Sequence, residues 1–243
     1  MDLRVAELLR ARGLPGTFYF SFVGHKGRQT LTPDHLRSLA SEGFEVGGHS
    51  LSHAVLPQLR SQDIAREVGI CKDKLEDILG ECVWMFCYPK GRFNASVIKQ
   101  VKRAGYEGAR TTRMLRQALD FDPFQMPTSI PVYPNRKKMY ARNLVKGRNI
   151  RGLFDYVTQF ICLDSWVSMG KILFDRVLKE GGVWHLYGHS WQIEEMELWD
   201  DLKEMLDYVS HRRGVAYMPN RDILKLLPTA SDSILVGDLR LLK

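Results

Sequence analysis

The sequence lacks long apolar segments, has few cysteines and contains no low-complexity region. No run approaches the roughly 18 apolar residues of a membrane span, which excludes a transmembrane helix. The four cysteines show no CxxC spacing, so we expect reduced thiols. The first residues, MDLRVAELLRARG, are predicted to form a charged amphipathic helix rather than a secretory leader. These absences together predict a cytoplasmic protein.

The composition is that of a folded chain. The sequence has 243 residues, of which 44% are hydrophobic and 26% are charged. This balance excludes a disordered or a collagen-like protein. The length suits one α/β domain, and we expect residues 1–243 to form a single domain.

One pattern recurs along the chain: an amphipathic helix, a glycine and then a short apolar strand. Glycine after the last helical turn is typical of a left-handed helix end, and continuous apolar strands are typical of a buried parallel sheet. The strands predicted in this way are 17–23, 44–48, 106–110, 183–188 and 215–218, joined by 83–88 and 129–133. These units predict an α/β barrel or a wound sheet.

Several helix starts have their own signals. Thr32 followed by Pro33 is typical of a helix N-terminus, and Asn94 is expected to cap the helix that follows it. A long helix is predicted to begin at Ser61. Its apolar face is formed by residues at helical spacing, namely Ile64, Val68, Cys71, Leu75 and Leu79.

The segment at about 123–154 differs from the rest of the chain. It contains no Asp or Glu, and it carries seven cations, equal to the whole net charge of +7: Arg136, Lys137, Lys138, Arg142, Lys146, Arg148 and Arg151. We interpret the segment as a basic insertion. It is predicted to be either a solvated loop or a surface that recognises an anionic substrate.

His49 and His53 stand at the end of the strand FEVGG. Two histidines four residues apart share one face if the segment turns into a helix, and imidazole suits zinc and similar divalent ions. The alternative is a polar helix start capped by Ser50 or Ser52. A strand end is also where α/β barrels place functional residues.

Two further groups follow strands. Residues 86–94, FCYPKGRFN, begin within the predicted strand VWMFCY and continue into the loop after it. A plain turn would explain Pro89, Gly91 and Asn94. It would not explain why Tyr88, Lys90 and Arg92 occur together there. His189 follows the strand VWHLYG, and histidine carries a proton readily near neutral pH. All these groups lie at predicted carboxyl ends of strands, where α/β folds build active sites.

The remaining histidines are assigned no catalytic role. His185 shares the face of His189 and is predicted to be a satisfied interior histidine. His25, His35 and His211 are predicted to lie in loops or solvent-facing turns.

These motifs jointly resemble a known family. The motif GGHSLSH resembles the metal-binding motif of the NodB-homology polysaccharide deacetylases, which form carbohydrate esterase family 4. FCYPKGRFN resembles the groove-wall motif of this family, and HLYGHSW resembles its late histidine motif. RARGLPGTFYF is similar to the family's second strand. The resemblance covers roughly residues 3–225 and implies a distorted (β/α) barrel of the polysaccharide deacetylase type.

The resemblance also implies roles for residues. His49 and His53 would bind a divalent metal, zinc in most members, and His189 would be the catalytic acid. Substrate binding would fall to the strand-end loop and a nearby aromatic side chain, namely Tyr88, Pro89, Lys90, Gly91, Arg92 and Trp191. The metal and the loop backbone would polarise the acyl carbonyl.

One departure from the family concerns its first strand. That strand ends in T-F-D-D-G, which supplies the catalytic base and a third metal ligand, and no such motif occurs in this sequence. We therefore expect the barrel to lack its first strand and to leave an open sheet edge. The chain is either a truncated version or a naturally degenerate member; the clean helix leading straight into TFYF favours truncation.

The leading functional hypothesis is a metal-dependent hydrolase that removes an N-acetyl or N-formyl group from an amino sugar. The basic insertion favours a sugar carried on a nucleotide or lipid phosphate over a neutral polysaccharide. A second hypothesis is a non-catalytic carbohydrate-binding protein, in which Tyr187, Trp191 and Trp199 stack on sugar rings. Nucleic-acid binding through residues 136–151, with Tyr140 stacking on a base, is the third, and the absence of a recognised nucleic-acid motif argues against it.

Overall fold

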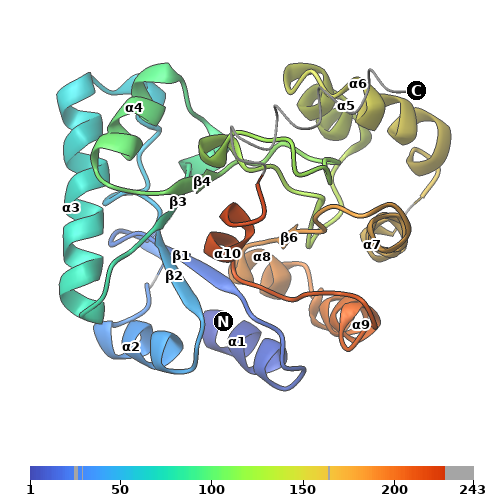
Figure 1. Ribbon diagram of the computed structural model, residues 1–243, viewed down its shortest axis with the longest axis horizontal. Helices are drawn as coiled ribbons and strands as arrows, with labels where there is room; N and C mark the ends of the chain where they lie inside the picture. Colours follow the sequence, from blue (N-terminus) through green and yellow to red (C-terminus); the bar gives the residue numbers. More distant parts are fainter. Residues whose placement is uncertain (25–26, 29, 164, 228–243) are drawn as a thin grey trace, which may run out of the picture.

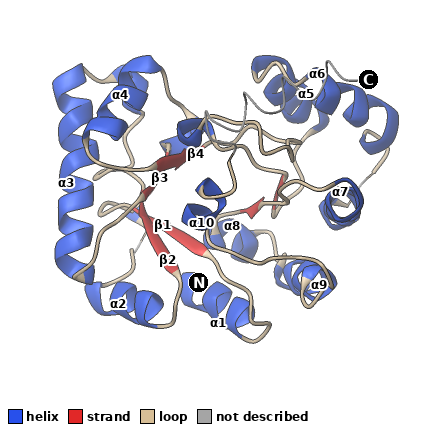
Figure 2. Ribbon diagram, viewed as in Figure 1, coloured by secondary structure: helices blue, strands red, loops and turns tan. Residues whose placement is uncertain are grey.

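The computed structural model describes residues 1–24, 27–28, 30–163 and 165–227. Its strands form two parallel sheets, one with the order β1-β2-β3-β4 and one with the pair β5-β6 (Figures 1 and 2). The strand bounds are β1 Thr17–Phe20, β2 Glu45–Gly48, β3 Met85–Cys87, β4 Gly108–Arg110, β5 Ile130–Pro131 and β6 Leu186–Tyr187. The predicted α/β class with parallel sheets is confirmed.

Helices surround the two sheets. α2, α3 and α4 lie beside the four-stranded sheet, α7 and α9 lie beyond the two-stranded sheet, and α10 lies between the sheets (Figure 1). The α-helix bounds are α1 Asp2–Arg10, α2 Pro33–Ser41, α3 Ser61–Leu79, α4 Ala95–Arg103, α5 Lys137–Lys146, α6 Ile150–Asp155, α7 Trp166–Glu180, α8 Ser190–Glu195, α9 Trp199–Val209 and α10 Asn220–Leu224. The shorter turns are η2 Leu56–Gln58, η3 Pro89–Gly91, η4 Pro123–Gln125 and the π-helix η5 Tyr156–Phe160.

The predicted helix starts are confirmed. The Thr32 side chain accepts a hydrogen bond from the His35 backbone N–H, and Pro33 is the first helical residue of α2. Asn94 Oδ1 accepts from the Val97 N–H at 3.0 Å at the start of α4. The expectation that His35 lies in a loop or turn was wrong. His35 lies in the first turn of α2, where its Nδ1 accepts a hydrogen bond from the Thr32 N–H and completes the cap.

Two predicted elements were wrong. The basic insertion is not a loop, since residues within it form α5 and α6. Residues 215–218 form no strand although their apolar pattern favoured one. Their neighbour Asn220 instead donates its side-chain N–H to Tyr19 Oη and its backbone N–H to Thr17 Oγ1, so polar contacts attach this segment to β1.

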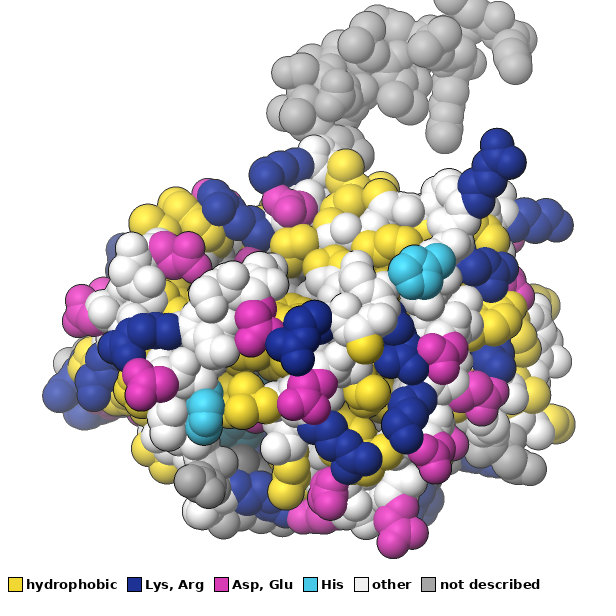
Figure 3. All heavy atoms as spheres, turned by 90° about the horizontal axis from the view of Figure 1, so that it is seen from below, with side chains coloured by type: hydrophobic (Ala, Val, Ile, Leu, Met, Phe, Trp, Pro, Cys, Tyr) yellow, Lys and Arg dark blue, Asp and Glu magenta, His cyan; other side chains and the backbone are white. Residues whose placement is uncertain are grey.

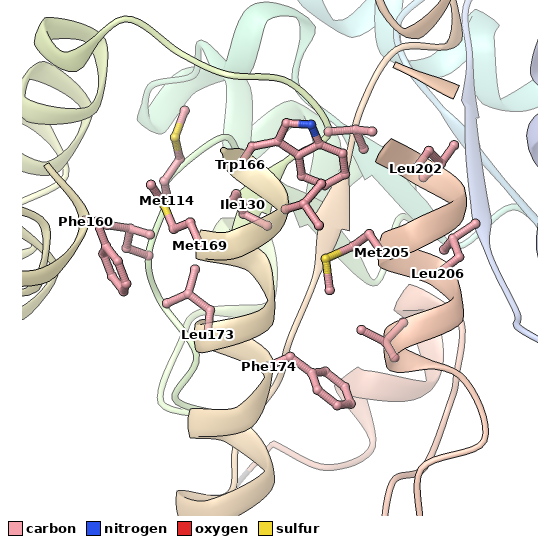
Figure 4. Packing of buried hydrophobic residues seen from close by; sticks show 14 of the residues in the cluster. Met114, Ile130, Phe160, Trp166, Met169, Leu173, Phe174, Leu202, Met205 and Leu206 are labelled. Carbon is pink, nitrogen blue, oxygen red and sulfur yellow. The ribbon is translucent and has the colours of Figure 1, made fainter. Parts of the chain in front are cut away.

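The apolar residues form separate clusters around the two sheets. Phe86, Leu36 and Val68 belong to the cluster between the four-stranded sheet and helices α2–α4. The other cluster joins β5 to α7 and α9, and Figure 4 shows Met205 between these two helices. Both sheets are therefore held by burial of one apolar face beneath helices.

The strand β1 is at the edge of its sheet. In the described residues β1 pairs with β2 alone, in a register that sets Thr17 opposite Glu45 and Phe20 opposite Gly48. The predicted open edge is confirmed in this part of the chain. None of the helices that the structure describes is long and apolar enough to cross a bilayer.

Candidate active site

His49 lies directly after the carboxyl end of β2 and is oriented by the neighbouring strand. Its backbone N–H donates to Phe20 O at 2.8 Å, and its Nδ1 lies 2.7 Å from Cys87 O at the end of β3. A backbone carbonyl beside Nδ1 favours the tautomer with the proton on Nδ1, which leaves the lone pair on Nε2. Metal-binding histidines are commonly held in this way.

The ring of His53 packs edge-on to that of His49, with 4.9 Å between the ring centroids. The structure therefore brings the predicted pair together, but the predicted helix is wrong. Residues 49–55 are irregular, and positive φ angles at Ser50 (63°) and His53 (57°) turn the chain instead. The alternative of a capped helix start also fails, because Ser52 Oγ donates to Glu67 Oε1 and no helix begins there.

The groove-wall loop divides into a buried and an exposed part. Tyr88 and Pro89 are buried; the Tyr88 hydroxyl donates to Phe124 O at 2.9 Å, and burial raises the Tyr88 pKa far above its ordinary value. Lys90 and Arg92 are exposed. Gly91 has φ 62° and faces Thr112 so closely that a side chain would overlap it. Tyr88 and Pro89 thus support the loop, while the two cations reach solvent.

His189 lies after β6, in the other sheet. Its Nδ1 is 2.7 Å from Gln192 Oε1, so the amide oxygen accepts the Nδ1–H and Nε2 becomes the nitrogen that can transfer a proton. The ring of Trp191 has its centroid 5.5 Å from that of His189. Both side chains belong to the turn that enters α8.

Loops from the two sheets meet at this end of the molecule. Arg28, in the loop after β1, places its guanidinium carbon 4.3 Å from the Trp191 ring centroid and forms an ion pair with Glu195 of α8. The same loop is joined to the histidine loop, because the Phe22 and Val23 N–H groups donate to Leu51 O. The loop after β1 therefore contacts both the loop that carries the His49–His53 pair and the helix that follows His189. His25 lies outside the described residues.

Sequence reasoning missed a polar network inside the barrel. Arg110, at the end of β4, is 3% exposed and donates to Asn220 Oδ1 and Pro127 O, and burial lowers its pKa to about 10. The signal was an arginine at the carboxyl end of the predicted strand YEGAR. The network holds α10 against the four-stranded sheet and so positions the strands that carry the site.

His185 confirms its predicted interior place. Its Nδ1 lies 3.0 Å from Thr128 Oγ1, and burial, together with the positive charge of Arg110, lowers the His185 pKa well below its ordinary value. A histidine kept neutral in this way suits a structural position. His211 lies after the end of α9 and is exposed, as expected.

Two of the aromatic side chains that were predicted to stack on a sugar or a base are buried in the structure. Trp199 is 8% exposed, and its Nε1–H donates to Glu194 Oε2. Tyr140 is buried and stacks on Tyr156 with 5.1 Å between ring centroids. Neither ring can receive a ligand without repacking, whereas Trp191 remains partly exposed.

The described residues fit a metal ion only in part. His49 and His53 offer two imidazole nitrogens, whereas catalytic zinc takes three protein ligands. Within residues 1–227, apart from 25, 26, 29 and 164, no group of three or more His, Cys, Asp or Glu side chains is placed to hold a metal. The pair is therefore a partial ligand set.

The sequence comparisons agree with this geometry. Residues 2–109, which include the His49–His53 pair and the Tyr88 loop, match the family model for polysaccharide deacetylases. This part of the chain is therefore similar to the polysaccharide deacetylases. The match ends at β4, so the late histidine and the basic insertion lie beyond the matched residues.

Relatives of this polysaccharide deacetylase family match the same half of the chain. The peptidoglycan-N-acetylmuramic acid deacetylase PdaA of Bacillus subtilis is 27% identical over 105 residues, which are 43% of this chain. YxkH of Bacillus subtilis, assigned to the polysaccharide deacetylases, is 25% identical over 107 residues, also 43% of the chain. The chain spans 38% of the length of each of these relatives.

Solved structures share the fold over most of the chain. A Mycobacterium smegmatis protein assigned to the polysaccharide deacetylases superposes with a TM-score of 0.66 at 16% identity, covering 93% of this chain and 76% of its own. BA3943 of Bacillus anthracis, described as a CE4 family pseudoenzyme, gives 0.50 at 17% identity, covering 91% and 59%. The distorted-barrel fold therefore extends past the matched half, and it is found in both an assigned deacetylase and a pseudoenzyme.

Proposed function

We propose that this protein removes an N-acetyl or N-formyl group from an amino sugar. The observation that carries the proposal is the His49–His53 pair, with its rings 4.9 Å apart and the first histidine held by the Cys87 carbonyl. The pair lies at the carboxyl end of a parallel sheet, where this class of fold binds substrates. The relative PdaA is named as a deacetylase of peptidoglycan N-acetylmuramic acid, which is such an amino sugar.

The chain's own residues suit three tasks in this reaction. A divalent ion, when bound, would act as a Lewis acid on the acyl oxygen. His49 and His53 would hold it through ring nitrogens. Water would supply the oxygen that bonds to the acyl carbon as the carbon–nitrogen bond breaks. His189 in its imidazolium form would give its Nε2 proton to the leaving amine, while Gln192 accepts the Nδ1–H. Lys90 and Arg92 would attract a phosphate-linked sugar to the rim.

Metal binding is tested by calorimetric titration of the purified chain with zinc. We expect His49→Ala and His53→Ala each to weaken zinc binding at least about tenfold, since either removes one ligand of the pair. His211→Ala is the control, because His211 is exposed and distant in sequence. Equal zinc affinity in all three variants would refute the metal assignment.

Catalysis is tested by release of acetate from N-acetylated oligosaccharides with added zinc, and by adding formate as an external base. A hydrolase with a partial site is expected to respond to formate, which supplies the carboxylate that the described residues do not place beside the pair. His189→Gln is expected to lower the rate about 100-fold or more and to leave zinc affinity unchanged. An unchanged rate would remove His189 from the role of acid.

The second candidate is sugar binding without catalysis. It is supported by the incomplete ligand set of the described residues. Saturable binding of an N-acetylated oligosaccharide, with no acetate released with zinc and formate present, would favour this candidate over the hydrolase. Loss of binding in Trp191→Ala would then identify the stacking side chain.

A further inference from the structure

The basic insertion has an apolar face that points to solvent. On α6 and η5, Ile150 is 82% exposed, Phe154 is 67% exposed and Val157 is 55% exposed. Their spacing of four and then three residues puts them on one side of the continuous helix. Met139 and Val145 of the neighbouring α5 are also more than half exposed. We call the three side chains of α6 and η5 the apolar patch.

The patch is additional to the protein core. The opposite side of the same helices is already buried, because Tyr140, Leu144, Tyr156 and Phe160 all belong to the cluster around α7 and α9. The helices are also fixed by polar contacts, since Asn143 Nδ2 donates to Thr112 O at 2.7 Å. Core packing therefore explains one face of the insertion and leaves the apolar patch unexplained.

The basic insertion that carries the apolar patch is also rich in exposed cations. All seven cations of the insertion are exposed, and among the described residues only Arg151 forms a salt bridge, to Glu180 at 3.0 Å. No acidic residue lies between positions 123 and 154. The face in Figure 3 differs, because there Lys and Arg side chains are interspersed with Asp and Glu. Six of the seven cations therefore form no salt bridge with a described residue.

We propose that the apolar patch and its cations dock this protein on the surface of a membrane rich in anionic phospholipid. Exposed apolar side chains on a basic helix enter the boundary between headgroups and acyl chains, and each nearby Lys or Arg is attracted to the lipid phosphates. Nucleic acid is a poorer match, because it would use the cations but not the apolar residues, and Tyr140 is buried. The proposal does not depend on hydrolase activity.

The start of the insertion lies near the late histidine motif. α5 begins six residues after β5 ends, and β5 pairs in parallel with β6, whose carboxyl end leads to His189. Tyr133, in the connection to α5, places its hydroxyl 3.3 Å from that of Tyr187. α6 extends towards the other end of this sheet, because Arg151 forms its ion pair with Glu180, the last residue of α7, shortly before β6 begins.

The test is flotation of the purified chain with vesicles. We expect it to float with vesicles of equal parts phosphatidylcholine and phosphatidylglycerol, to float poorly with pure phosphatidylcholine, and to dissociate as salt rises. Equal binding to both vesicle types, or binding to neither, would overturn the proposal. Retention on RNA or DNA without flotation would assign the surface to nucleic acid and overturn it as well.

Variants separate the two contributions. Phe154→Glu and Ile150→Glu are each expected to weaken flotation about tenfold or more, while Met196→Glu, at an exposed apolar position between α8 and α9, leaves it unchanged. Lys138→Glu is expected to weaken it about fivefold or more, with Lys99→Glu on α4 as the charge control. Circular dichroism confirms the fold of each variant. Flotation that is the same in patch and control variants would refute the assigned surface.

Discussion

At the scale of single residues, the loop after β3 depends on one glycine. Gly91 combines a positive φ of 62° with a neighbour, Thr112 Oγ1, that would lie 2.0 Å from an added Cβ. Gly80 ends α3 with a similar φ of 71°, and nothing lies within 4 Å of its added Cβ. Substitution of Gly80 would therefore test backbone strain alone, whereas substitution of Gly91 would test strain and steric overlap together.

We predict that Gly80→Ala lowers the free energy of unfolding by about 1 kcal/mol, from backbone strain alone. Gly91→Ala is predicted to lower it by about 3 kcal/mol, because overlap with Thr112 adds to the same strain. Urea unfolding followed by circular dichroism measures both values. Equal losses would show that Thr112 moves aside at no cost.

Residue-scale chemistry also marks the limit of what the sequence could predict at the site. The motif GGHSLSH led to the His49–His53 pair, yet the predicted helix was wrong. Positive φ angles at Ser50 and His53 turn the chain, and such angles are uncommon at any residue other than glycine, so the sequence alone did not indicate them. Arg110 and Asn220 are separated by 110 positions, so no local pattern could place them together. The periodicity of apolar residues cannot predict polar contacts between residues that are far apart in the sequence.

At the scale of elements, α7 and α9 are joined by close side-chain packing. Met205 of α9 is fully buried, and its Sδ would lie 2.8 Å from a Cβ added to Gly170 of α7 (Figure 4). The small residue on one helix thus admits the long side chain of the other, which is how ridges fit grooves. Helix type and approximate bounds were predictable here from the apolar period.

We predict that Met205→Ala lowers the free energy of unfolding by about 2–5 kcal/mol, because it leaves a cavity between α7 and α9. Met196→Ala, at an exposed methionine, is predicted to change it by less than about 0.5 kcal/mol. Both values come from denaturant unfolding. A small loss in Met205→Ala would mean that the helices close over the cavity.

In two segments the sequence pattern predicted the wrong secondary structure. Residues 215–218 read as a strand, but the chain there enters the polar contacts of Asn220 with Thr17 and Tyr19. Residues 137–155 read as a basic loop, yet a buried apolar set including Tyr140 and Leu144 folds them as helices. In both segments, contacts with distant parts of the chain determined the secondary structure, which the local sequence pattern alone did not.

At the scale of the whole molecule, the space between the two sheets contains ionisable groups kept away from water. Arg110 and His185 both lie there, and burial lowers the pKa of each. A histidine with a lowered pKa binds fewer protons in the folded than in the unfolded protein. Its contribution to stability is therefore complete above an unfolded pKa of about 6.5 and is lost as the pH falls below it.

We predict that the melting temperature of the natural sequence falls as the pH is lowered from neutral towards about 5, and that His185→Gln makes this fall shallower. His211→Gln, at an exposed histidine, is predicted to retain the natural slope. Thermal unfolding across a pH series measures all three. Parallel curves for the natural sequence and His185→Gln would show that His185 is protonated in the folded state without penalty.

The exposed apolar and basic side chains of α5 and α6 have a kinetic consequence. A protein held on a surface by these helices would meet a lipid-borne sugar by lateral diffusion rather than by collision in bulk solution. The speed of encounter would then follow the number of both molecules per unit area of bilayer. Dilution of the aqueous phase would leave that speed nearly constant, whereas dilution of the bilayer with inert lipid would slow it.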